Sequence, residues 1–437
     1  MVHLQTKNII RYVVPTILSG IYFFLFTIVD AVFVGRGVGT DALGAMNLIG
    51  PFVMVVGAIN MMINIGGVAI FAVHIGKKDI EGANKVFRHG MILLLCVSMV
   101  LSFIGMFFTD GICTMLGADE TFHQLAADYL FWYSLFIIPS ALSIGLQSYC
   151  RNDGAPGLVN FVVIVSTVCN IFGDWLLIFP IQWGTKGAAI ATGISQTIGL
   201  FIVLIHFIRK QGVIRFGRIK IEVSLFRDIV MHGLTEGISQ LATPIMTFCM
   251  NTVLLNKVGD LGVNSFAIIC NISAFSMAVF FGASEGLQPL FGQSYGARNE
   301  KDLKTYFKAG MGISFFGSIF ITVLAVLFGR NICALFGADA VTQEYILKAL
   351  PQFAVGFIVM ALNVMVSSYL YSTERTMQAL SISILRSIIV NAAVILILPY
   401  IFGESIIWFT LLIYETIVFV VASVLLKHSE KNGITFI

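Results

Sequence analysis

Long apolar segments recur along the whole of this chain, and each is long enough to cross a lipid bilayer. A membrane-spanning helix needs about 20 mostly apolar residues. Twelve segments meet this requirement: 12–34, 43–73, 90–110, 123–149, 158–180, 188–208, 228–256, 263–291, 309–328, 346–371, 378–400 and 406–426. Only 11% of the residues are charged, whereas a soluble domain carries roughly 25%. The sequence therefore predicts an all-α integral membrane protein with twelve transmembrane helices.

The distribution of Lys and Arg predicts the orientation of these spans. Twelve spans put both termini on one side of the membrane. The segments on that side hold 20 of the 26 Lys and Arg residues, the opposite side holds five, and Arg386 lies within a span. Basic residues are enriched in short cytoplasmic loops. We therefore expect both termini in the cytoplasm, and the short loops favour a bacterial inner (plasma) membrane.

An internal repeat relates the two halves of the chain. The segment ICTMLGAD at 112–119 is followed by ICALFGAD at 332–339, an offset of 220 residues, and five of the eight positions are identical. The same offset aligns Gly90 with Gly310. An offset that recurs at separate places along the chain indicates a duplicated unit.

The repeat predicts two six-helix lobes, at 1–208 and 225–437, joined by a basic cytoplasmic linker at 209–224. Because six is even, both lobes enter the membrane in the same orientation, which makes the repeat parallel. Transporters use such halves to enclose a central cavity that opens alternately to each side. A duplicated scaffold with no transport role is the alternative interpretation.

Two carboxylates fall within spans of the first half, where ionisable side chains are costly and usually face a cavity or a partner. Counting from the span ends places Asp30, Asp174 and Thr192 about 8–9 Å below the outer surface. Asn170 lies one turn deeper than Asp174 on the same helix face. These oxygens suit a hard cation such as Na⁺, and two close carboxylates also suit a shared proton. A hydrogen-bonded polar cluster that only joins helices is the alternative.

The second half carries a different set of charges. Glu236 in span 7, Glu285 in span 8 and Arg386 in span 11 fall in the inner-to-middle zone, and Glu415 falls near the middle of span 12. The first three are predicted to bind substrate, as an acidic surface for a cationic molecule. A buried salt bridge between Arg386 and one of the Glu residues is the structural alternative.

Three segments resemble those of the MATE family (multidrug and toxic compound extrusion). They are VDAVFVGRGVGTDALGA at 29–45, NIFGDWLLIFPIQWGTKGAAIATGISQ at 170–196 and GLQPLFGQSYGARNEKDLKTYFKAG at 286–310. The resemblance extends over essentially the whole chain. It implies a cation-coupled antiporter with a V-shaped cavity between two lobes, which exports organic cations and other amphipathic drugs as H⁺ or Na⁺ moves inward.

The resemblance also implies roles for individual residues. In the prokaryotic branch with an Asp in the first helix, a cation site in the first lobe is built from residues that match Asp30, Asn170, Asp174 and Thr192. These four would be metal ligands if Na⁺ is the coupling ion. Glu285 resembles an acidic residue that is linked to the recognition of cationic drugs in bacterial members.

Other classes of protein fit the sequence less well. A flippase for lipid-linked precursors would need a basic cavity for pyrophosphate, whereas most intramembrane charges here are acidic. A membrane enzyme would need a nucleophile–base pair or a metal cluster, and a channel would need a continuous polar pore. We therefore expect a monomeric transporter without enzymatic activity. Its partners are predicted to be small cationic or amphipathic substrates and the bilayer, with no nucleic acid and no cofactor beyond the coupling ion.

Overall fold

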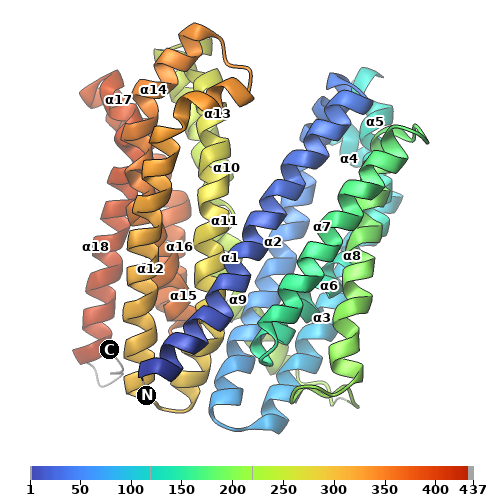
Figure 1. Cartoon of the computed structure of the whole chain (residues 1–437), viewed down its shortest axis with the longest axis vertical. Helices are drawn as coiled ribbons and strands as arrows, with labels where there is room; N and C mark the ends of the chain where they lie inside the picture. Colours follow the sequence, from blue (N-terminus) through green and yellow to red (C-terminus); the bar gives the residue numbers. More distant parts are fainter. Residues whose placement is uncertain (1, 119, 219, 432–437) are drawn as a thin grey trace. The chain divides into compact units, whose positions relative to one another are not determined.

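The computed structural model describes residues 2–118, 120–218 and 220–431, and all regular structure within these ranges is helical (Figure 1). In chain order the elements are α1 (Val2–Gly37), α2 (Thr40–Gly76), α3 (Ile80–Phe107), α4 (Thr109–Met115), α5 (Glu120–Leu135), α6 (Ile137–Asn152), α7 (Pro156–Ile178), α8 (Gly184–Ile208), α9 (Val223–Ser239), α10 (Ala242–Lys257), α11 (Asp260–Gly296), α12 (Glu300–Leu327), α13 (Gly329–Leu335), α14 (Ala340–Ala354), α15 (Gly356–Ser372), α16 (Thr376–Ile384), the π-helical segment η1 (Leu385–Ile389), α17 (Val390–Phe402), the 3₁₀ segment η2 (Glu404–Phe409) and α18 (Thr410–Lys431).

The predicted number of membrane spans is confirmed. Within the described residues, eleven helical stretches are long and apolar enough to cross a membrane. A twelfth span consists of Phe122–Leu135 and Ile137–Asn152, which bend by 49° at the break between them. Each of the twelve coincides with one predicted segment. The protein is therefore an all-helical, multi-pass membrane protein.

The repeat predicted from the sequence recurs in the helix bounds. The helices α2 and α11 are both 37 residues long, α3 and α12 are both 28, and α4 and α13 are both 7. The bounds of each pair differ by the predicted 220 residues. The caps match as well, because the Asp79 side chain accepts from the N–H of Gly82 at the start of α3, and Asn299 accepts from that of Asp302 at the start of α12. The parallel two-half architecture is thus confirmed.

The second half departs from the first at three places. The single helix α8 corresponds to the 3₁₀ segment η2 followed by α18. The single helix α1 corresponds to two helices, α9 and α10, which are separated by a break at 240–241. The single helix α7 corresponds to α16, η1 and α17, so a π-helical turn interrupts the α-helix. Short π-helical segments are frequent at functional sites. Arg386 lies in this segment.

Packing divides the chain into two compact units. The N-unit is Leu18–Gly233, and the C-unit combines the chain before Leu18 with the chain from Leu234 onward. The chain therefore changes unit inside α1 and again inside α9. The lobe and linker boundaries predicted from the repeat rest on sequence similarity instead of packing, and they stay a prediction.

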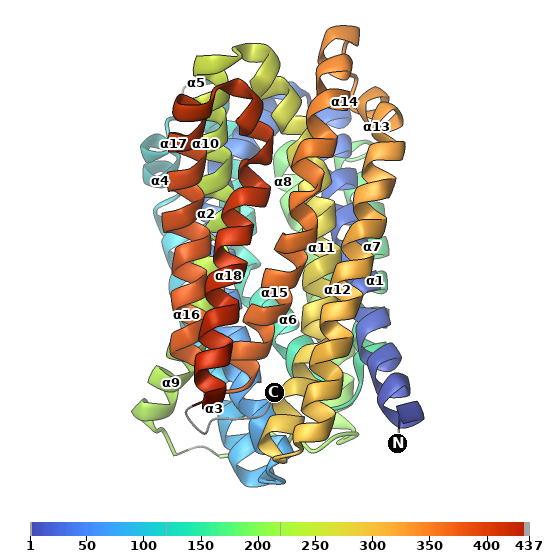
Figure 2. The ribbon, with the colours of Figure 1, turned by 90° about the vertical axis from the view of Figure 1, so that its left-hand side faces the viewer.

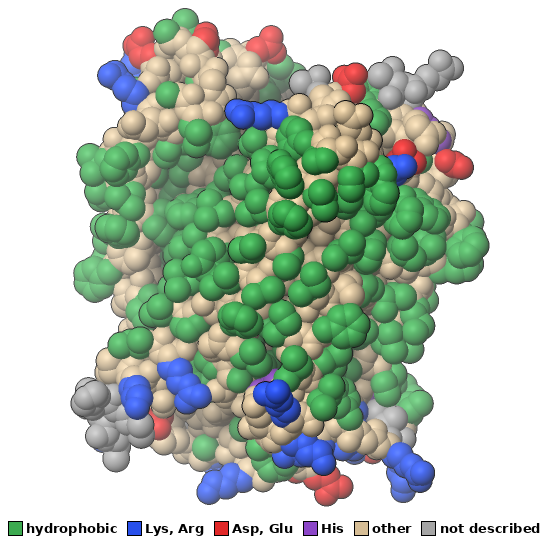
Figure 3. All heavy atoms as spheres, turned by 45° about the vertical axis from the view of Figure 1, so that its right-hand side comes forward, with side chains coloured by type: hydrophobic (Ala, Val, Ile, Leu, Met, Phe, Trp, Pro, Cys, Tyr) green, Lys and Arg blue, Asp and Glu red, His purple; other side chains and the backbone are tan. Residues whose placement is uncertain are grey.

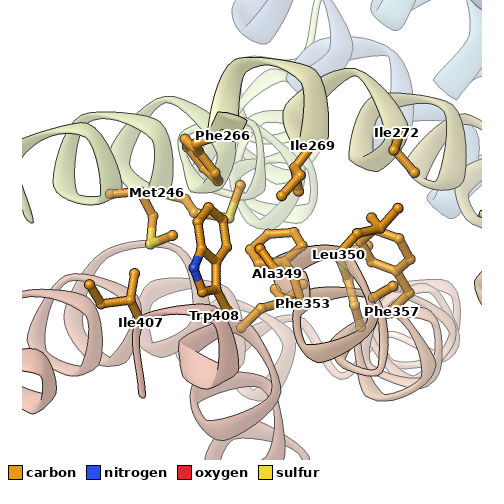
Figure 4. Packing of buried hydrophobic residues seen from close by; sticks show 14 of the residues in the cluster. Met246, Phe266, Ile269, Ile272, Ala349, Leu350, Phe353, Phe357, Ile407 and Trp408 are labelled. Carbon is orange, nitrogen blue, oxygen red and sulfur yellow. The ribbon is translucent and has the colours of Figure 1, made fainter. Parts of the chain in front are cut away.

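Aromatic side chains form the core of the C-unit. Trp408 packs against Phe266 and Phe353, with ring centroids 6.3 and 6.4 Å apart (Figure 4). Its indole N–H donates to the Tyr345 hydroxyl at 3.4 Å. The helices α11, α12, α15 and α18 pack side by side around this half of the chain (Figure 2). An indole with a polar partner satisfies its N–H while burying its ring.

Two helices of the N-unit touch through their backbones. A Cβ added to Gly66 on α2 would lie 2.0 Å from the carbonyl oxygen of Ile229 on α9. A Cβ added to Gly233 on α9 would lie 1.7 Å from the carbonyl oxygen of Met62 on α2. Small residues allow helices in membranes to approach this closely. Glycine is therefore required at both positions of the contact.

The outer surface is suited to lipid. Hydrophobic side chains cover the middle of the face in Figure 3, and Lys and Arg gather along its lower edge. Large apolar side chains are widely exposed; Phe316, for example, is 72% accessible. A monomeric soluble protein rarely exposes apolar patches of this extent. This surface agrees with a bilayer as the surrounding medium.

Candidate functional site

Four polar side chains predicted to form a cation site lie together in the N-unit. They come from three helices: Asp30 from α1, Asn170 and Asp174 from α7, and Thr192 from α8. The Asn170 amide donates to the Thr192 hydroxyl at 3.2 Å. The carboxylate of Asp174 lies close enough to that of Asp30 for the two to interact electrostatically. The helices α7 and α8 pack closely along their length, which brings these side chains to one level (Figure 1).

Four carboxyl and amide oxygens of this cluster lack a hydrogen-bond donor in the described part of the chain. Asn170 and Asp174 are fully buried. Among the described residues, no partner reaches either carboxylate oxygen of Asp174, Oδ1 of Asp30 or Oδ1 of Asn170. An unpaired buried carboxylate costs several kcal/mol. A set of buried acceptors without donors is the arrangement that a bound cation or an added proton would satisfy, so these residues fit such an ion.

Tyr129 of α5 lies near the same cluster, and it was not among the residues predicted to form the cation site. It lies near enough to the carboxylates of both Asp30 and Asp174 to be coupled to them electrostatically. Its ring stacks on that of Tyr133, one turn further along α5, with centroids 6.1 Å apart. The depth count that grouped the four other residues considered carboxylates, amides and aliphatic hydroxyls. The same count of depth, applied to the Tyr residues of the neighbouring span, would have identified Tyr129.

A small cavity of about 80 Å³ lies next to the cluster. Its lining combines aromatic rings with short polar side chains: Phe23, Phe26, Ile144, Gln147, Val163, Ser166, Thr167, Ser195 and Gln196. Thr167 precedes Asn170 by three residues on α7, and Ser195 follows Thr192 by three residues on α8. The cavity therefore begins about 5 Å from the cluster, toward the membrane interior.

Arg386 forms a buried ion pair in the C-unit. Its Nη2 lies 2.9 Å from Oε1 of Glu415, and its Nε donates to both carboxylate oxygens at 3.0 Å. The side chains of Arg386 and Glu415 are only 6% and 1% exposed. The Asn363 amide donates to Glu415 Oε2 at 2.6 Å. The structural alternative considered for Arg386 is thus present, and a role in substrate binding stays a prediction.

Two further carboxylates lie near this ion pair. Glu236 on α9 is buried, and it accepts a hydrogen bond from the Gln240 amide at 2.7 Å. It interacts electrostatically with Glu285 on α11 and with Arg386. The three residues predicted to bind substrate therefore share one electrostatic neighbourhood in the C-unit. With Glu415, this neighbourhood holds three acidic side chains and one basic side chain.

The ion pair of the C-unit occupies positions that the repeat makes equivalent to two residues of the N-unit cavity. Subtracting the offset of 220 from 386 and 415 gives Ser166 and Ser195, which both line the 80 Å³ cavity. Two short serine side chains in the first half thus correspond to the two longer, ion-paired side chains of Arg386 and Glu415 in the second. The equivalent positions line a cavity in the N-unit and hold an ion pair in the C-unit.

Comparison with known proteins gives consistent results across the chain. The family model MatE matches residues 15–176 and 237–397. The multidrug export protein MepA of Staphylococcus haemolyticus is 23% identical over 98% of this chain and 94% of its own length. MepA of Staphylococcus saprophyticus is 22% identical over 98% and 95% of the two chains.

Solved structures share the fold. A MATE structure in the straight conformation has a TM-score of 0.91 at 22% identity, covering 96% of this chain and 95% of its own. A MOP superfamily transporter from Pyrococcus furiosus, described as having a binding pocket of reverse polarity, has a TM-score of 0.90 at 22% identity with the same coverage. At this identity the likeness concerns the fold.

Proposed function

Since this chain belongs to the MatE family of membrane transporters, we propose that it is an antiporter that exports organic cations or amphipathic drugs in exchange for H⁺ or Na⁺. The relatives named as multidrug export proteins support the substrate class. We further propose that it acts as a monomer in the plasma membrane with both termini in the cytoplasm. The asymmetric distribution of Lys and Arg supports this orientation.

One observation carries the coupling part of the proposal, namely the buried acceptor oxygens of Asp30, Asn170 and Asp174 that have no donor. In the proposed cycle, H⁺ or Na⁺ binds there and adds one positive charge to the N-unit. Thr192 and Tyr129 complete the ligand set and orient the carboxylates. The oxygens serve either ion, because hard cations and protons both favour oxygen ligands.

Charge repulsion supports an exchange mechanism. If a cationic substrate approaches the coupling ion to about 8 Å, two unit charges at that separation repel by about 2 kcal/mol at an effective dielectric constant of about 20. This energy corresponds to an affinity change of about thirtyfold. Thermodynamic linkage requires the effect to be reciprocal, so ion binding expels the substrate and substrate binding expels the ion.

The acidic neighbourhood of the C-unit supports a cationic substrate. Glu236 and Glu285 add two carboxyl groups to those of the Arg386–Glu415 pair, in which the two charges neutralise each other. Such a surface attracts organic cations and repels the pyrophosphate of a lipid-linked precursor. A flippase is therefore the less favoured function.

Efflux of ethidium tests the proposal. The wild type, Asp30→Asn and Asp41→Asn would be compared in cells with an imposed proton or sodium gradient. Asp41 is a matched control, because it is an exposed carboxylate in the first turn of α2. We expect gradient-dependent efflux in the wild type and Asp41→Asn, and loss of that dependence in Asp30→Asn. Full gradient dependence in Asp30→Asn would refute coupling through this cluster, and no efflux from the wild type under any gradient would refute export of such cations.

A further inference from the structure

A second, larger cavity lies in the N-unit, away from the polar cluster. It has a volume of about 350 Å³, more than twice that of a cavity of roughly 150 Å³ that admits benzene. Its walls are mostly apolar, with Leu95 from α3, Leu142 from α6 and Leu200 from α8. Arg88 is the one charged residue of the lining. The cavity therefore suits a hydrocarbon chain with an anionic end.

The packing of three helices explains why this space exists. Among the described residues, α6 packs against both α3 and α8, whereas α3 and α8 do not pack closely against each other. A crevice remains between α3 and α8, and Leu142 and Leu146 of α6 form its floor. Outside the lining, Phe201, which follows Leu200 on α8, and Met99, one turn beyond Leu95 on α3, are 63% and 48% exposed. The crevice thus opens toward the lipid-facing surface.

The linker between the two halves closes one end of the crevice. Nε of Arg88 donates to the carbonyl oxygen of Arg215 at 3.0 Å, and Nη1 donates to that of Arg218 at 3.1 Å. The Phe216 ring packs against Phe87 of α3 at 5.4 Å, and it also contacts a ring of α8. These contacts hold the guanidinium group of Arg88 at the mouth of the cavity in a fixed position.

The lining changes from polar to apolar along the helix axis. Leu95 follows Arg88 by seven residues on α3, so the cavity extends about 10 Å from the guanidinium group toward the membrane interior. Arg88 itself is eight residues from the start of α3, on the side of the membrane that carries the chain termini. A cationic side chain at the level of the lipid headgroups, followed by an apolar cavity toward the membrane interior, matches the polarity of a phospholipid.

The charge of the linker selects the headgroup. Residues 209–222 include five Lys or Arg residues and a single acidic residue, Glu222, which pairs with Lys85. Juxtamembrane basic clusters attract anionic lipids of the adjacent leaflet. The same charge repels a cationic substrate, so an amphipathic drug is the less suitable occupant.

We propose that this cavity binds one acyl chain of a phospholipid with a net negative headgroup. The phosphate lies against Arg88 and Arg218, and the acyl chain lies along Leu95, Leu142 and Leu200. This site is independent of the polar cluster and of the proposed transport cycle. It links the lipid leaflet to the segment that connects the two halves of the protein.

Native mass spectrometry of the purified full-length protein tests the proposal. Phosphatidylglycerol and phosphatidylcholine with identical acyl chains would each be titrated against the wild type and four variants. Leu200→Trp fills the cavity, and Phe201→Trp is its control because that side chain points outside. Arg218→Gln removes a charge from the linker residue that contacts Arg88 but keeps its backbone carbonyl, and Arg209→Gln is its control on the same linker.

We expect the wild type to retain one phosphatidylglycerol molecule with at least fivefold preference over phosphatidylcholine. Arg218→Gln should weaken its binding by about fivefold, the change that corresponds to about 1 kcal/mol per basic residue near the surface. Leu200→Trp should abolish the tight site, and both controls should match the wild type. Equal binding of the two lipids, or unchanged binding in Leu200→Trp and Arg218→Gln, would overturn the proposal. Displacement of phosphatidylglycerol by ethidium in the wild type, with weaker ethidium binding in Leu200→Trp, would instead assign the cavity to substrate.

Discussion

Removing one partner of the Arg386–Glu415 ion pair should destabilise the protein more than removing both. In Glu415→Gln, the guanidinium group of Arg386 stays buried, at 6% exposure, without the counter-ion to which it is hydrogen-bonded. It also loses the charge of the acceptor that it contacts at 2.9 and 3.0 Å. Leaving one member of such a pair uncompensated costs about 3–5 kcal/mol. The double variant Arg386→Met, Glu415→Gln removes both charges of the pair, and its Gln side chain still accepts from Asn363.

The free energy of unfolding would be measured by titrating the purified protein from mild micelles into SDS. Four proteins make a double-mutant cycle: the wild type, Arg386→Met, Glu415→Gln and the double variant. We expect each single variant to lose about 3–5 kcal/mol, and we expect a coupling energy of at least about 2 kcal/mol. The Lys348–Glu344 pair has a similar distance of 2.8 Å but is more than 70% exposed on both sides. The matching cycle on that pair should show a coupling energy of less than about 1 kcal/mol.

Two results would refute this reasoning. A loss below about 1 kcal/mol in Glu415→Gln would mean that Arg386 is solvated or has another counter-ion. Additive losses in the double variant would mean that the two side chains do not depend on each other. A stable Arg386→Met variant that no longer binds ethidium would assign Arg386 to the substrate instead of to the fold.

Two further substitutions test other parts of the structure, each beside a matched control. Gly66→Ala should lower the melting temperature by several degrees, because its Cβ would lie 2.0 Å from a backbone oxygen of α9, and backbone overlap of this kind costs about 1–3 kcal/mol or more. Gly57→Ala on the same helix, whose Cβ would meet no atom within 4 Å, should have no such effect, and equal melting temperatures would contradict the close contact. Tyr129→Phe should shift the dependence of efflux on pH or Na⁺, because Tyr129 is coupled electrostatically to both carboxylates. Tyr133→Phe should keep the wild-type dependence, and identical profiles for the two variants would exclude this role for Tyr129.

The spans and the repeat could be predicted because both are encoded locally. A run of about 20 apolar residues is sufficient evidence for a span, and a recurring offset requires no knowledge of packing. The bounds of α2 and α11 differ by the same 220 residues as the sequence motifs. The grouping of Asp30 with Asp174 was also accessible, since both lie at a countable distance from a span end. Tyr129 was not predicted because a phenol can be buried in a membrane at little cost, so a Tyr within a span does not by itself indicate a functional site.

The partner of Arg386 could not be predicted from the sequence. Three carboxylates, Glu236, Glu285 and Glu415, lie at compatible depths, and the choice among them depends on the rotation of each helix. Arg386 lies in a π-helical turn, where the usual 3.6-residue period fails to give the direction of a side chain. The apolar cavity beside Arg88 was equally inaccessible, because it results from the incomplete contact between two helices that each pack on a third.

The two packing units are joined through the interiors of helices instead of through loops. The chain passes from the C-unit to the N-unit between Ile17 and Leu18 of α1, and it returns between Gly233 and Leu234 of α9. A loop absorbs rotation by turning about free dihedral angles, whereas a helix resists bending because its hydrogen bonds must stretch. A rearrangement of one unit against the other would therefore have to bend α1 and α9, and this bending would store elastic energy in the two helices. Pro15 removes one backbone hydrogen bond just before the first crossing, which makes that point the more compliant of the two.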